Sequence, residues 1–75
     1  MPHTFEDLVT LERLAEEARA AYTAAPDDDT RTTWLAAAEA FQAAVVEHAT
    51  AEGTSRYEAE MAAKRAVRHP EPEAA

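Results

Sequence analysis

The chain contains no cysteine, one glycine and one tryptophan among its 75 residues. The absence of thiols excludes disulfides and thiolate metal sites, and a single glycine leaves no glycine-rich loop to hold a phosphate. No apolar run approaches the roughly 20 residues of a membrane-spanning helix. The first residues also lack the charged-then-apolar order of a signal peptide. We therefore expect a soluble, cytoplasmic protein with no membrane segment.

Large apolar side chains are scarce as well. Hydrophobic residues make up 47% of the chain, but 20 of these 35 residues are alanine. A chain this short normally holds one domain, whose core is marginal unless disulfides, metal or oligomerisation support it. Alanine-rich helix faces suit close helix packing, near the lower end of the roughly 8–10 Å range. The composition therefore predicts self-association.

Two apolar stripes of similar length dominate the pattern, and both step by alternating threes and fours. This spacing keeps one face of an α-helix apolar. Pro26 and the three aspartates that follow it separate the stripes. The residues of the two stripes are Leu8, Leu11, Ala15, Ala18, Tyr22 and Ala25, then Trp34, Ala38, Phe41, Val45 and His48. The sequence thus predicts an all-α fold in which helices over 5–25 and 29–52 form an antiparallel hairpin.

Capping signals mark where the helices begin and end. Thr4 is a suitable N-cap for the first helix, and Asp27 to Asp29 offer caps for the second. Gly53 is the natural left-handed residue to close the second helix. Ser55 and Glu58 have the spacing of a capping box, which announces a third helix.

The third helix should cover 56–68 and complete a single helical domain over 1–69. Proline at position 70 cannot continue a helix, and the alternating prolines and glutamates beyond it cannot form a core. We therefore expect a disordered tail over 70–75.

If the first two helices fold back on each other, positions whose numbers sum to about 55 lie opposite. Tyr22 then meets Trp34, and large residues alternate with alanines across the seam. The apolar faces are wider than a two-helix seam requires, so a third helix or a partner must cover them. We expect two copies to pair as a four-helix-type homodimer. The predicted interface residues are Leu8, Leu11, Tyr22, Trp34, Leu35, Phe41, Val45 and His48.

No combination of residues indicates catalysis or metal binding. Glu12 and Glu16 lie one turn apart, but they alternate with alanine and arginine, which is typical of a solvated helix face. The three histidines lie on separate segments, and there is no Glu-x-x-His pair of the kind found in helical di-iron proteins. We predict no catalytic, cofactor-binding or metal-binding residue. His48 is expected to be a partly exposed residue near the end of the second helix, with a pH switch as the alternative.

Charge is distributed unevenly along the chain, whose net charge is -8. Residues 1–53 hold 11 acidic and 3 basic side chains, whereas 54–69 hold 2 acidic and 4 basic ones. The basic third helix should dock on the acidic outer faces of the first two, in its own chain or in a dimer mate. A contact with an anionic partner is the alternative, although the net charge opposes nucleic-acid binding. The residues available for such a contact are Arg56, Lys64, Arg65 and Arg68.

These observations favour a small non-catalytic protein-interaction or regulatory module that self-associates through alanine-rich and aromatic helix faces. Two other functions remain open. The chain could be a nucleic-acid-associated regulator that uses the third helix, or an acidic inhibitor or antitoxin that neutralises a basic partner.

Overall fold

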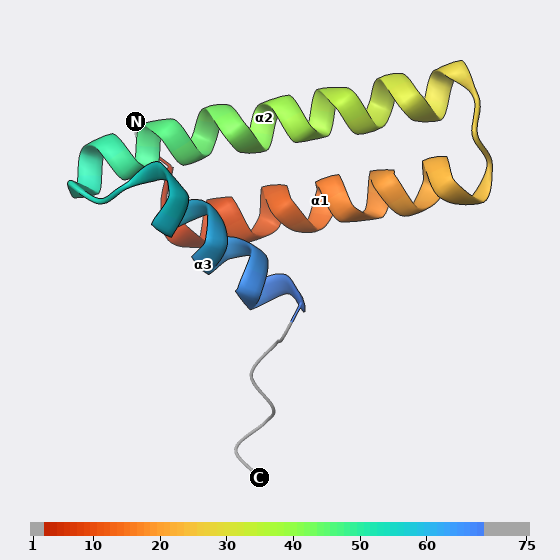
Figure 1. Ribbon diagram of the computed structural model, residues 1–75. Coiled ribbons are helices and arrows are strands. Elements are labelled where there is room, and N and C mark those ends of the chain that lie inside the picture. The colour runs from red at the N-terminus through yellow and green to blue at the C-terminus, as the bar shows by residue number, and fades with distance from the viewer. Residues whose placement is uncertain (1–2, 69–75) are drawn as a thin grey trace, which may run out of the picture.

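Three α-helices make up the computed structural model, which describes residues 3–68 (Figure 1). Helix α1 spans Phe5–Ala24, α2 spans Asp28–Glu52 and α3 spans Arg56–Arg68. The described residues contain no strand, which confirms the all-α class. None of these helices is long and apolar enough to cross a membrane. The predicted tail, 70–75, lies outside the described residues.

Reciprocal capping boxes begin the first two helices. The Asp7 N–H donates to the Thr4 hydroxyl over 3.1 Å, and the Thr4 N–H donates to the Asp7 carboxylate over 3.0 Å. The same pair of bonds joins Asp27 and Thr30, at 2.8 and 3.1 Å. Each box satisfies two backbone donors that a helix end leaves free. The N-cap of α1 is therefore Thr4, as predicted. In the second box, the Thr30 hydroxyl accepts the hydrogen bond from the N-cap backbone that a glutamate side chain usually accepts.

The junction between α2 and α3 is built from the predicted residues. Gly53 adopts a left-handed conformation, with φ of 69°, and its N–H donates to the Ala49 carbonyl. The Glu58 N–H then donates to the Ser55 hydroxyl over 3.0 Å, which caps α3. The Thr54 hydroxyl donates to the Glu58 carboxylate over 2.9 Å and is the main reason why the pKa of Glu58 lies below its ordinary value.

Helices α1 and α2 lie side by side and run in opposite directions (Figure 1). At the loop end, the rings of Tyr22 and Trp34 stack with their centroids 5.5 Å apart, which confirms that predicted pairing. At the other end, His48 Nδ1 donates to the carbonyl of His3 over 2.7 Å. Contacts at both ends therefore fix the alignment of the two helices.

The core lies where α3 packs against α1 and α2. Leu8, Phe41 and Val45 are its large apolar members, and each is at most 2% exposed. Helix α3 contributes only two buried side chains, those of Ala59 and Ala63. Small side chains let a helix approach its neighbours closely. The third helix therefore docks within its own chain, where it covers one side of the α1–α2 pair.

Candidate functional site

The residues predicted to form an interface fall into two groups. Leu8, Phe41 and Val45 belong to the chain's own core, so a partner cannot reach them in this conformation. Leu35 is exposed on α2. The half-buried members are Leu11, Tyr22, Trp34 and His48. A partner surface can therefore use only this second group, together with apolar residues that lay outside the predicted set.

The four predicted basic residues do not form one patch. The Arg56 side chain contacts α2, where its guanidinium donates a hydrogen bond to Gln42 Oε1 over 3.1 Å. Lys64, Arg65 and Arg68 come together around a shallow hollow of about 150 Å³ that Met61 also lines. Lys64 is in addition turned toward α1, because its ammonium lies 3.6 Å from a carboxylate oxygen of Glu12.

Glu12 corrects the prediction of a solvated acidic face. Its side chain is only 2% exposed, because α3 packs over this side of α1. Oε1 is the atom nearest Lys64, and Oε2 has no hydrogen-bond partner among the described residues. Glu16 is half-buried and accepts a hydrogen bond from Arg19 over 3.1 Å, whereas Asp27 to Asp29 are exposed, as expected.

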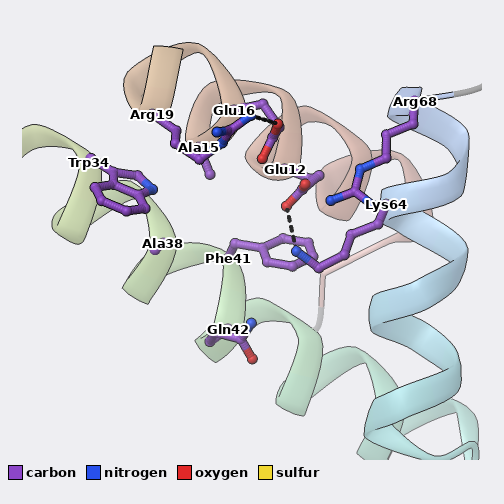
Figure 2. A pocket seen from close by; sticks show the side chains of 10 residues that line it. All are labelled: Glu12, Ala15, Glu16, Arg19, Trp34, Ala38, Phe41, Gln42, Lys64 and Arg68. Carbon is purple, nitrogen blue, oxygen red and sulfur yellow. Dashed lines mark hydrogen bonds and ion pairs between the residues drawn. The ribbon is translucent and has the colours of Figure 1, made fainter. Parts of the chain in front are cut away.

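Glu12 lies in a cleft of about 330 Å³ between the three helices (Figure 2). The Lys64 ammonium, at one end of the cleft, sits 5.4 Å from the centroid of the Phe41 ring. Trp34 lies at the far end. The full lining is Glu12, Ala15, Glu16, Arg19, Trp34, Ala38, Phe41, Gln42, Lys64 and Arg68. The cleft thus combines two aromatic rings with five charged side chains.

Two neighbouring carboxylates in this cleft have opposite pKa shifts. Burial raises the pKa of Glu12 above its ordinary value, and the attraction of Lys64 and Arg68 only partly offsets this, while Glu16 repels the charged form. For Glu16, the hydrogen bond from Arg19 holds the pKa below its ordinary value. Burial is therefore the main cause of the raised pKa of Glu12, and the hydrogen bond from Arg19 is the main cause of the lowered pKa of Glu16.

The raised pKa of Glu12 predicts a pH dependence of stability. Because the folded chain binds this proton more tightly than the unfolded chain, Glu12 lowers the free energy of unfolding as pH rises from the ordinary value through the raised pKa. We expect urea unfolding between about pH 4 and pH 8 to show this loss in the natural chain relative to Glu12→Leu. Glu16 and Glu58 have the opposite shift, so the comparison with Glu12→Leu isolates the one group. An identical pH profile for both chains would contradict the assignment.

His3 and His48 lie at the opposite end of the α1–α2 pair from the Trp34 stack. His3 lies 3.8 Å from the Asp7 carboxylate and 3.6 Å from the Glu47 carboxylate. His48 is half-buried near the end of α2, as predicted. Within residues 3–68, no group of three or more histidine or acidic side chains is arranged to hold a metal ion.

The hydroxyl groups nearest the helix ends are used for capping. Thr4, Thr30 and Ser55 each bond to the backbone of a helix start.

The cleft between the three helices offers charged groups, hydrogen-bonding groups and aromatic surface, which suit the binding of a ligand. Comparison of the chain with protein families, with curated proteins and with solved structures finds no match.

Proposed function

We propose that the chain is a small non-catalytic protein-interaction module that self-associates as a homodimer. The observation that carries this proposal is the amount of apolar surface left uncovered in a chain with a small core. The exposed large apolar side chains are Phe5 at 41%, Leu14 at 50%, Leu35 at 44%, Val46 at 48% and Tyr57 at 72%. Because so few large residues are buried, covering more apolar surface in a dimer would add substantially to stability.

The face best suited to dimerisation carries Leu14. Successive residues of a helix are about 100° apart, so Leu14 lies on the opposite side of α1 from Glu12 and Glu16, which line the cleft beside α3. We call this the Leu14 face, and its six uncharged residues are Leu11, Leu14, Ala18 and Ala21 of α1 with Ala37 and Ala40 of α2. Their spacing of threes and fours is that of a helix-packing seam.

The Leu14 face is large enough only for a weak dimer. Its α1 residues extend over about 15 Å, so two helices 8–10 Å apart present a strip of about 300 Å² per copy. Two such strips bury about 600 Å², below the range for stable protein interfaces, so the dimer should form only as concentration rises. Alanines allow the two α1–α2 pairs to approach closely and form a four-helix arrangement, with α3 of each copy on the outside.

Sedimentation equilibrium of Leu14→Glu tests this proposal. The natural chain should approach twice its 8.2 kDa mass as concentration rises, whereas Leu14→Glu should remain at 8.2 kDa because it places a charge in the seam. Val46→Glu is the matched control, since Val46 is similarly exposed, at 48%, but lies outside the Leu14 face. A natural chain that stays monomeric at millimolar concentration would overturn the proposal. Equal loss of the dimer in both variants would assign the interface to a different surface.

The nucleic-acid alternative has less support. Arg56 bonds to Gln42 and Lys64 pairs with Glu12, so two of the four basic side chains of α3 are engaged within the chain. This leaves Arg65 and Arg68 as the α3 cations with neither an ion pair nor a side-chain hydrogen bond among the described residues, in a chain with a net charge of -8. Phosphate binding depends on several such contacts acting together.

A further inference from the structure

We propose that the cleft between the three helices binds a small carboxylate with an apolar body that also carries a hydroxyl group. This site lies on the α3 side of the α1–α2 pair, away from the Leu14 face, so it does not depend on dimerisation. Three observations define the ligand: a buried carboxylate with an unsatisfied oxygen beside Lys64, a cation in excess of the carboxylates, and an aromatic wall.

The buried carboxylate with an unsatisfied oxygen is that of Glu12, beside Lys64. Glu12 is 2% exposed, yet its Oε2 has no hydrogen-bond partner among the described residues. Lys64 Nζ lies 3.6 Å from Glu12 Oε1 and 4.0 Å from Glu60 Oε2, distances too long for strong hydrogen bonds. An unsatisfied buried polar atom destabilises the folded chain. A hydroxyl can donate to the carboxylate and accept from the ammonium, so one such group would satisfy both partners.

The charges that line the cleft favour an anion. Arg19 pairs with Glu16 and Lys64 with Glu12, whereas Arg68 takes part in none of the ion pairs between residues 3–68. The cleft therefore holds one cation more than it holds carboxylates, although the chain as a whole is strongly acidic. A guanidinium binds a carboxylate with two parallel hydrogen bonds, which makes Arg68 the group for the ligand's acid end.

The apolar lining of the cleft suits the apolar body of the proposed ligand. Trp34, Ala38 and Phe41 of α2 give it an apolar side, and its volume of about 330 Å³ can hold a single aromatic ring with short substituents (Figure 2). Glu12 Oε2 is out of contact with solvent. The hydroxyl therefore reaches this atom only when a covering side chain moves aside.

Titration by NMR with defined probes tests the site. The probes are 4-hydroxyphenylacetate and its 3-hydroxy isomer, which differ in the spacing between hydroxyl and carboxylate. Phenylacetate lacks the hydroxyl, and tyramine replaces the carboxylate with an amine. At least one hydroxy acid should shift the signals of Glu12, Phe41 and Trp34 and bind about tenfold more tightly than phenylacetate, as expected for one hydrogen bond to a charged group. Tyramine should bind more weakly than either acid.

Three variants assign the contacts. Glu12→Leu should make phenylacetate and the hydroxy acids bind equally, because the hydroxyl loses its acceptor. Arg68→Gln should weaken every acid about tenfold, whereas Arg65→Gln, a neighbouring exposed arginine, should leave the affinities unchanged. The proposal is overturned if no probe shifts the cleft signals at millimolar concentration. It is equally overturned if the hydroxyl gives no advantage in the natural chain, or if Arg65→Gln has the same effect as Arg68→Gln.

Discussion

Replacement of Lys64 by methionine is expected to lower the free energy of unfolding by about 2–3 kcal/mol at pH 7. Methionine keeps most of the length of the side chain and its packing on Phe41, so the main loss is the positive charge beside Glu12. The carboxylate then remains buried, with Arg68 as the nearest source of compensation. Lys64 is 23% exposed, so we place the loss below the 3–5 kcal/mol found when a fully buried pair is broken.

Removal of both charges should reverse this loss. Glu12→Leu combined with Lys64→Met leaves no buried charge, and apolar replacement of buried ion pairs is typically neutral or stabilising by about 1–4 kcal/mol. Urea unfolding of the two single variants and the double variant gives the coupling energy directly. The cost of Lys64→Met should also shrink at low pH, because Glu12 is then protonated. A cost that is the same at pH 4.5 and pH 7, or that the second substitution does not recover, would show that lost packing is responsible.

The helices and their ends could be predicted because their signals are local. Thr4 and Gly53 act on backbone groups within a few residues of themselves, so the sequence alone specifies what they bond to. The Tyr22–Trp34 stack could be predicted for a related reason: a short loop leaves two antiparallel helices few alignments. These features do not depend on how the third helix docks.

The docking of α3 explains what could not be predicted. A glutamate on a helix rich in alanine and arginine is typical of a solvated face, and the residues next to Glu12 in the sequence do not show that another helix covers it. Leu8, Phe41 and Val45 were assigned to an interface on the same incomplete basis, since they are buried in a core that the chain's own three helices form. One signal was available: Glu12 lies four residues after Leu8 and three before Ala15, so its position belongs to the buried side of the helix.

The character of several residues that line the cleft could be predicted from the sequence, but their meeting in one site could not. Trp34 and Phe41 were recognised as members of an apolar stripe, and Lys64 and Arg68 as members of a basic helix. Their common site arises only because α3 crosses the α1–α2 pair at a level that leaves a gap beside Trp34 (Figure 2). That crossing depends on Ala59 and Ala63, whose small side chains are compatible with many docking positions.

Phe41→Ala is expected to cost about 3–5 kcal/mol, the usual range for the loss of a buried aromatic side chain. Phe41 is 2% exposed at the centre of the core, and it also carries the Lys64 ammonium on its ring. A domain of this size has a total stability of about 4–11 kcal/mol, so the variant should be close to half unfolded at room temperature if the chain lies near the lower limit. Phe41→Leu should cost less, because it removes less volume.

Leu35→Ala is the control for Phe41→Ala, since Leu35 lies on the same helix but is 44% exposed. Truncation at such a position should change stability by less than about 1 kcal/mol. Both variants should be measured by urea unfolding at two protein concentrations. If Leu35→Ala proves as costly as Phe41→Ala, and its cost grows with concentration, then Leu35 is buried by a second copy and the dimer uses the α2 surface beside Trp34. If its cost is large at every concentration, the placement of Leu35 outside the core is wrong.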